Sequence, residues 1–199
     1  MNHEFTFRIV VIVLFSLLAA IGIYHRTQAA KSDEKITRQK EGVLIMILLR
    51  LFGFSMWIGL LIYMINPQWM EWSAFLLPSW LRWLGAAFGI MAIPLIYWMF
   101  SSLGKNVTDT VVIRKEHSLI THGPYRLIRH PMYLFSFLYF TGLSLLTANW
   151  FIWITGLLAL ALLIVRTPIE EAALIAKFGD EYRSYLKRTG RFFPRFGKM

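Results

Sequence analysis

The sequence predicts an all-α integral membrane protein with five transmembrane helices and a cytoplasmic C-terminal amphipathic helix. Three observations support this fold class. The 199 residues are 57% hydrophobic and only 16% charged. The apolar residues gather in long runs of the length that crosses a bilayer. The basic residues gather in alternate loops, as they do in membrane proteins of defined topology.

Five apolar stretches mark the predicted helices: Ile9–Tyr24, Val43–Ile65, Leu84–Leu103, Met132–Thr147 and Trp150–Val165. A helix rises about 1.5 Å per residue, so the second and third stretches cross a hydrocarbon core of roughly 30 Å. The other three are near the lower limit of length, and we expect them to tilt little or to end below the headgroups. The alternating polarity of a β-barrel strand is not visible in the sequence.

The first stretch, Ile9–Tyr24, has a second interpretation as the apolar core of a cleavable signal peptide. No clean small-residue cleavage site follows it, and cleavage would export the basic segment 25–42. We therefore interpret this stretch as an uncleaved first helix.

The distribution of positive charge predicts the topology. Eighteen of the 21 Lys and Arg residues lie in segments 25–42, 104–131 and 166–199, whereas segments 66–83 and 148–149 contribute only Arg82. Positively charged loops mark the cytoplasmic side of a membrane. We therefore expect a protein of the cell's plasma (inner) membrane, with its N-terminus outside and its C-terminus in the cytoplasm. The net charge of +10 is then explained by topology and by attraction to membrane lipids, and not by a nucleic-acid partner.

The chain is predicted to form a single membrane domain, residues 1–199. Its last two helices are joined only by residues 147–149, which predicts a tight antiparallel hairpin. Both free ends of this hairpin lie at the cytoplasmic face, so the two richest polar segments of the chain meet there. The sequence contains no Cys, which excludes disulfides, thiolate catalysis and thiolate metal sites.

The first polar segment is "HGPYRLIRHPMY", residues 122–133. Its Gly-Pro and His-Pro pairs are turn signals, so one interpretation is a rigid re-entry loop with Tyr125 and Tyr133 as interfacial anchors. Its histidines, arginines, tyrosines and backbone donors also suit a small zwitterionic or nucleoside-bearing ligand. Two histidines eight positions apart, without an HExxH-like pattern, do not predict a metal site. Neither a phosphate-binding loop nor a GxSxG nucleophile elbow is present.

The second polar segment is "VRTPIEEAALIAKFGDEYRSYL". Thr167 as N-cap, Pro168 at the first helical position and Glu170 three residues after the cap predict a capping box. We expect an amphipathic helix over about 168–188, lying along the membrane surface or folded back over the loop. Glu170 and Glu171 then have two open interpretations, as groups that stabilise the helix start or as catalytic groups.

Two arginines in or beside apolar helices also have two interpretations each. Arg166 ends the fifth helix and either extends to the headgroups or binds a carboxylate, with Glu170 four residues on to orient it. Arg50 lies a third of the way into the second helix, where an ionisable group is either functional or reaches back to the interface.

The quoted segments together resemble the isoprenylcysteine carboxyl methyltransferase family, to which phospholipid methyltransferases are distantly related. The resemblance covers residues 100–195 and rests on "HGPYRLIRHPMY", then "RTPIEE", then "FGDEYRSYLKRTGRFFP". It implies a membrane enzyme that takes a methyl group from S-adenosylmethionine and transfers it to a lipidic carboxylate. On this interpretation residues 1–103 supply three helices and residues 104–199 supply the cofactor-binding and catalytic part.

The resemblance also implies roles for individual residues. The cofactor-binding residues would be His122, Gly123, Pro124, Tyr125, His130, Pro131, Tyr133 and Glu171. The catalytic pair would be Arg166 and Glu170, with Arg166 holding the acceptor carboxylate. Two departures from the family pattern bear on the acceptor: Phe135 stands where Gly is frequent, and Val107 stands where Trp is frequent.

The acceptor therefore stays open at the sequence level. A lipidic or prenylated carboxylate is the first expectation, and methyl transfer to it requires alignment rather than a metal ion. A phospholipid amine or a small thiol is the alternative, and either would require a base to remove a proton. A second alternative is a non-enzymatic membrane transporter or assembly protein whose polar loop binds a ligand.

Overall fold

The computed structural model describes residues 3–30, 37–38, 43–107, 112–113 and 118–195. The regular secondary structure of the described part is helical apart from one small antiparallel ribbon of two two-residue strands. The elements are, in chain order, α1 (His3–Ala30), β1 (Thr37–Arg38), α2 (Val43–Ile65), the 3-10 helix η1 (Pro67–Ser73), α3 (Ser79–Leu103), η2 (Gly104–Asn106), β2 (Val112–Ile113), η3 (Gly123–Arg126), α4 (Pro131–Thr147), α5 (Trp150–Phe178) and α6 (Asp180–Arg188).

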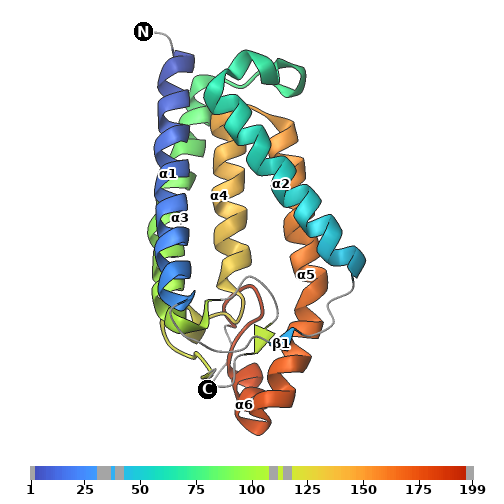
Figure 1. Cartoon of the computed structure of the whole chain (residues 1–199). Coiled ribbons are helices and arrows are strands. Elements are labelled where there is room, and N and C mark those ends of the chain that lie inside the picture. The colour runs from blue at the N-terminus through green and yellow to red at the C-terminus, as the bar shows by residue number, and fades with distance from the viewer. Residues whose placement is uncertain (1–2, 31–36, 39–42, 108–111, 114–117, 196–199) are drawn as a thin grey trace.

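Helices α1 to α5 run up and down beside one another, with the N-terminus at one end of the bundle (Figure 1). Helix α6 and the β1–β2 ribbon lie at the opposite end. Helices α1, α2, α3 and α5 are each long and apolar enough to cross a membrane, whereas α4 is shorter, at 17 residues. The predicted apolar stretches all form helices, and the all-helical membrane class is confirmed.

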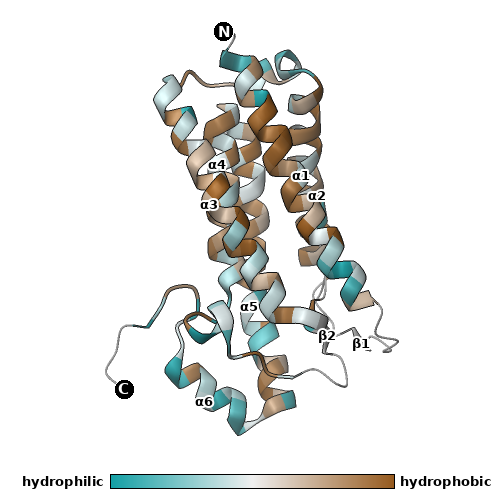
Figure 2. Cartoon of the chain, turned by 90° about the vertical axis from the view of Figure 1, so that its left-hand side faces the viewer, coloured by the Kyte–Doolittle hydropathy of each residue, from teal (hydrophilic) through white to brown (hydrophobic). Residues whose placement is uncertain are grey.

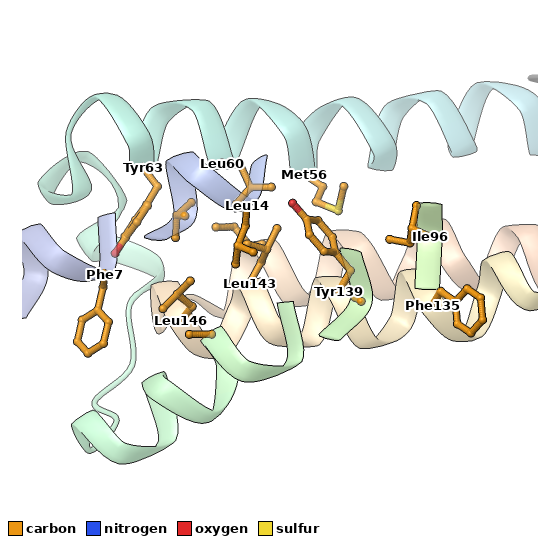
Figure 3. Close-up of a cluster of buried hydrophobic side chains, with 14 of the residues drawn as sticks. Phe7, Leu14, Met56, Leu60, Tyr63, Ile96, Phe135, Tyr139, Leu143 and Leu146 are labelled. Atoms are coloured by element: carbon orange, nitrogen blue, oxygen red, sulfur yellow. The ribbon is translucent and has the colours of Figure 1, made fainter. Parts of the chain in front are cut away.

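The core lies along α4, which packs against α1, α3 and α5. Buried side chains from helices α1 to α5 meet there, and Figure 3 shows part of this cluster. They include Phe7 and Leu14 of α1, Met56, Leu60 and Tyr63 of α2, Ile96 of α3, and Phe135, Tyr139, Leu143 and Leu146 of α4. Close packing of these side chains gains van der Waals contacts between the helices and fixes α4 in the centre of the bundle.

Glycines bring α3 and α4 into close contact. A Cβ atom added at Gly142 would lie 2.8 Å from the Gly85 carbonyl oxygen, and one added at Gly85 would lie 2.6 Å from the Gly142 oxygen. These distances are shorter than real Cβ contacts, so only glycine allows the two backbones to approach this closely.

A polar cluster ties four helices together at the N-terminal end of the bundle. The Arg82 guanidinium donates to Glu4 Oε2 at 2.6 Å, to Glu4 Oε1 at 3.1 Å and to the Leu146 carbonyl at 2.9 Å. The Tyr63 hydroxyl donates to Glu4 Oε1 at 2.6 Å, and the Arg82 guanidinium lies 4.0 Å from the centre of the Phe7 ring. Arg82, the lone basic residue of its segment, therefore has a structural role.

The prediction of a capping box and of a helix over 168–188 is wrong. Helix α5 continues through Pro168 to Phe178, and the Thr167 hydroxyl donates to the Leu163 carbonyl at 3.2 Å as an interior helical residue does. The helix ends instead at Gly179, whose φ of 54° is the left-handed conformation that glycine adopts without strain. Packing of a long apolar helix has overridden the local turn signals.

After Gly179 the chain forms α6, a helix of nine residues. Tyr182 and Tyr185 are buried, and the charged residues Arg183 and Lys187 are exposed. Figure 2 shows α6 as a largely hydrophilic helix beyond the hydrophobic part of the bundle. Its position along a membrane surface stays a prediction.

Candidate active site

The 122–131 loop lies against the end of α3, and a glycine permits this close contact. Gly123 has a φ of 61°, and a Cβ atom added there would collide with the Ser102 hydroxyl of α3. Pro124 follows as a buried residue of η3, while His122 is exposed as the N-cap of η3. Gly123 and Pro124 therefore shape the loop through the backbone, and His122 lies at its surface.

The loop ends where α4 begins. His130 is the N-cap residue of α4, and Pro131 occupies a position in the first turn where a missing N–H removes no helical hydrogen bond. The buried rings of His130 and Tyr133 stack with 5.3 Å between centroids and 6° between planes. The start of α4 thus presents a rigid imidazole and phenol pair.

Glu171 of α5 is the centre of an ionic network. Its Oε1 accepts from Arg129 Nε at 3.0 Å and lies 3.3 Å from both His130 Nε2 and Arg191 Nε. Its Oε2 accepts from Arg191 Nη2. Both oxygens of this buried carboxylate are therefore engaged by the protein itself, which favours an organising role for Glu171 over direct contact with a ligand.

Glu170 is different although it is the preceding residue. Its side chain is 30% exposed, against 8% for Glu171. Its Oε2 accepts from the Tyr133 hydroxyl at 3.4 Å and lies 4.0 Å from His130 Nδ1. The two carboxylates therefore bracket the His130 ring, with Glu171 inside the network and Glu170 towards accessible space.

Arg166 and Tyr125 complete the group. Arg166 is buried one turn before Glu170 on α5, and the charges of both residues act on the Tyr133 hydroxyl. Burial, and then the neighbouring Glu170, Tyr185 and Tyr133, raise the pKa of Tyr125 well above its usual value. The Tyr125 phenol therefore stays protonated at neutral pH and is available as a hydrogen-bond donor.

The structure thus brings together six of the ten predicted site residues: Tyr125, His130, Tyr133, Arg166, Glu170 and Glu171. Their binding or catalytic roles stay predictions. Of the two departures from the family pattern, Phe135 packs in the core and Val107 is also buried. Arg50 is exposed on α2, which favours the interpretation that it reaches to the interface.

Sequence reasoning missed Arg129 and Arg191, the two arginines that bind Glu171. Both lie inside the quoted segments, but basic residues at a cytoplasmic edge were attributed to topology. The sequence signal that could have found Arg129 is its position inside the motif, directly before the His-Pro pair that begins α4. In the structure its side chain is only 10% exposed.

An open apolar groove lies along α5 beside the acidic pair. It has a volume of about 490 Å³, and its lining on α5 is Pro168, Ile169, Ala172, Ala173 and Ala176. Within the described ranges, no group of three or more His, Asp or Glu side chains is placed to hold a metal ion.

The comparison with protein families identifies this arrangement. A model of the phospholipid methyltransferase family matches residues 80–181, the stretch that holds α3 to α5 and all ten predicted site residues. The chain belongs to the phospholipid methyltransferase family. The predicted resemblance is thereby confirmed at the level of the family.

Individual relatives add detail. The chain is 37% identical over 84 residues to a cobalt-zinc-cadmium resistance protein of Cupriavidus metallidurans, covering 41% of this chain and 38% of that protein. It is 36% identical over 83 residues to the protein-S-isoprenylcysteine O-methyltransferase of Schizosaccharomyces pombe, covering 40% of this chain and 34% of that protein. The chain thus matches less than half the length of these relatives.

A solved structure shares the fold. The eukaryotic intramembrane Ras methyltransferase, an isoprenylcysteine carboxyl methyltransferase, superimposes with a TM-score of 0.54 and 20% sequence identity. The superposition covers 93% of this chain and 67% of that chain. Both the N-terminal helices and the family segment therefore belong to one shared membrane fold.

Proposed function

We propose that this protein is an S-adenosylmethionine-dependent membrane methyltransferase that resembles protein-S-isoprenylcysteine carboxyl O-methyltransferase and methylates a lipidic carboxylate. The observation that carries the proposal is the convergence of Arg166, Glu170 and the stacked pair of His130 and Tyr133 at one end of the bundle. A buried guanidinium next to an accessible carboxylate and aromatic rings suits a ligand pair in which one member is cationic and the other anionic.

The residues present fit S-adenosylmethionine. When bound, it supplies a methyl group on a positively charged sulfur, together with an ammonium and ribose hydroxyls. Glu170 offers a partly exposed carboxylate for positive charge or hydroxyls, and Tyr125 offers a protonated phenol as a donor. The Tyr133 ring, stacked on His130, offers an aromatic surface that attracts a cation through its quadrupole.

The chain's own residues also account for the acceptor side. Arg166 is positioned to hold a carboxylate, because a guanidinium matches it with two parallel hydrogen bonds. The apolar groove from Pro168 to Ala176 provides a surface for the hydrocarbon part of such an acceptor. Burial around Arg166 excludes water, which strengthens its interaction with an anion and favours alignment of the reacting groups.

The first experiment is ligand binding, followed by an acceptor screen. Purified protein in mild detergent is titrated with S-adenosylmethionine in a calorimeter; heat of saturable binding is expected. Methyl-labelled donor is then supplied with N-acetyl-farnesylcysteine, phosphatidylethanolamine or methanethiol. A base-labile label on the prenylcysteine supports an ester product, and a stable label refutes one.

The alternatives have distinct outcomes in the same screen. A phospholipid amine is favoured by the family match, and a thiol by the 30% identity over 70 residues to a methanethiol S-methyltransferase of Pseudomonas deceptionensis. Either acceptor needs a base, for which Glu170 beside His130 is the candidate. Absence of donor binding would instead favour a non-enzymatic membrane protein.

We further propose that helices α1 to α5, the shorter α4 included, all cross the plasma (inner) membrane, with the N-terminus outside and the site in the cytoplasm. The asymmetry of basic residues supports this orientation. Because the chain has no Cys, Gln68→Cys in η1 and Ser184→Cys in α6 each create a single label site. A membrane-impermeant maleimide should label intact cells at position 68 and not at position 184. The reverse pattern would invert the topology.

A further inference from the structure

The segment Thr189–Phe192, here called the strap, lies along the 122–131 loop, here called the motif loop. The Arg129 amide donates to the Gly190 carbonyl at 2.9 Å, and the His130 amide donates to the Arg191 carbonyl at 3.1 Å. Ile128 and Gly190 form a parallel bridge. The strap is therefore joined to the residues immediately before α4 through the backbone of both segments.

Side chains of both the motif loop and the strap reinforce this contact. Arg129 Nη1 donates to the Leu186 carbonyl at 3.2 Å and to the Thr189 carbonyl, so the loop holds the end of α6 and the start of the strap. In return Arg191, the third residue of the strap, binds both oxygens of Glu171. One carboxylate of α5 thus connects the loop and the strap.

The next residue of the strap covers the aromatic pair. The Phe192 ring lies 6.0 Å from the His130 ring and 5.5 Å from the Tyr133 ring, measured between centroids. The following residue, Phe193, points away and is 69% exposed. The strap therefore presents one aromatic side chain to the site and one to the surroundings.

We propose that Arg191 and Phe192 are positioning residues of the methyl-donor site. Glu170 reaches His130 and Tyr133 at 4.0 and 3.4 Å, so the orientation of these rings decides where its carboxylate meets a ligand. Glu171 contacts the His130 ring through Nε2, and Phe192 packs against both rings. Arg191 holds Phe192 in place by fastening the strap to Glu171. This inference rests on the proposed function.

Arg191→Ala and Arg195→Ala form a matched pair for the test. Both remove one positive charge from an exposed arginine of the same C-terminal segment, but Arg195 donates to the Lys187 carbonyl at 3.1 Å, whereas Arg191 binds Glu171. We expect Arg191→Ala to weaken S-adenosylhomocysteine binding at least about tenfold, and Arg195→Ala to change it less than about twofold. Arg191→Lys keeps the charge without the two-pronged geometry and should fall between them.

Phe192→Ala and Phe193→Ala form the second pair. Removal of the ring that packs on His130 and Tyr133 should weaken binding, whereas removal of the exposed ring should not. Phe192→Leu retains most of the apolar volume and should restore part of the affinity. These leucine and lysine variants carry the test where an alanine variant fails to fold.

Hydrogen exchange supplies a readout that does not depend on turnover. Peptides that contain the Arg129 and His130 amides should exchange faster in Arg191→Ala than in Arg195→Ala, because these amides bond the strap. Faster exchange together with weaker donor binding supports the proposal. Unchanged affinity in Arg191→Lys, Phe192→Leu and their alanine counterparts would overturn it, whatever the exchange shows.

Titration of the wild-type protein distinguishes failure of the proposed function from failure of the positioning role alone. If the wild-type protein binds no S-adenosylmethionine or S-adenosylhomocysteine, the proposed function fails and this inference fails with it. If the wild-type protein binds and the strap variants bind equally well, only the positioning role is refuted.

Discussion

Arg129 and Glu171 lie 42 positions apart in the chain and form a buried ion pair with 3.0 Å between Arg129 Nε and Glu171 Oε1. Their side chains are only 10% and 8% exposed. A buried pair is costly to break because the remaining charge stays desolvated without a partner. The pair therefore fixes the relation between the motif loop and α5, which carry most of the candidate site.

Removing the charge of Glu171 should destabilise the protein. Glu171→Gln keeps the shape of the side chain but leaves Arg129 and Arg191 without a carboxylate, and we expect a loss of about 3 kcal/mol in unfolding free energy. Reversible thermal unfolding in detergent measures it. Asp180→Asn is the control, because the Asp180–Arg183 pair is exposed and should contribute less than about 1 kcal/mol. Equal effects of the two variants would contradict a buried network.

Glu170 should show the opposite behaviour. Its side chain is partly exposed and its hydrogen bond from Tyr133 is long, at 3.4 Å, so Glu170→Gln should shift the thermal midpoint little. Methyl transfer should nevertheless fall by about a hundredfold, the typical effect of removing a positioned acid–base or electrostatic group. Full activity in Glu170→Gln would remove this residue from the catalytic pair.

The sequence predicted the features that depend on hydropathy and on local motifs. The apolar stretches located every long helix, and the short connection at residues 147–149 located the α4–α5 hairpin. The capping box at Thr167 was wrong because its signal is local, whereas helix α5 is stabilised by packing along its length. Gly179, an ordinary glycine in the sequence, proved to be the helix end through its positive φ.

Only part of the site could be predicted from the sequence. The motifs supplied His130, Tyr133 and Glu170, but not the different surroundings of two adjacent glutamates. Those surroundings depend on Arg191, which reaches Glu171 only because the strap returns to the motif loop. A hydrogen bond between backbones leaves no pattern in side-chain types, so this return is invisible in the sequence.

The close approach of α3 and α4 gives a stability prediction. Gly142→Leu forces a side chain against the Gly85 backbone, and overpacking of this kind costs about 1–3 kcal/mol. Gly22→Ala is the matched control, because an added Cβ there meets no atom within 4 Å. It should leave stability unchanged or raise it by about 0.5–1 kcal/mol through helix propensity. Thermal unfolding of both variants decides, and a tolerated Gly142→Leu would refute the tight crossing.

The polar cluster at the N-terminal end of the bundle tests whether stability and donor binding are separable. Arg82→Ala removes the guanidinium that holds Glu4, Tyr63 and the Leu146 carbonyl, and the loss of these partly buried hydrogen bonds should cost about 2 kcal/mol or more.

The cluster lies at the end of the bundle opposite to the strap and α6 (Figure 1). The dissociation constant for S-adenosylhomocysteine should therefore stay within about twofold of the wild-type value, because distant sites without shared partners act independently. Calorimetry below the thermal midpoint of the variant measures it. A tenfold weakening would show that the two ends are coupled through α4, whose Leu146 accepts from Arg82 and whose first turn carries Tyr133.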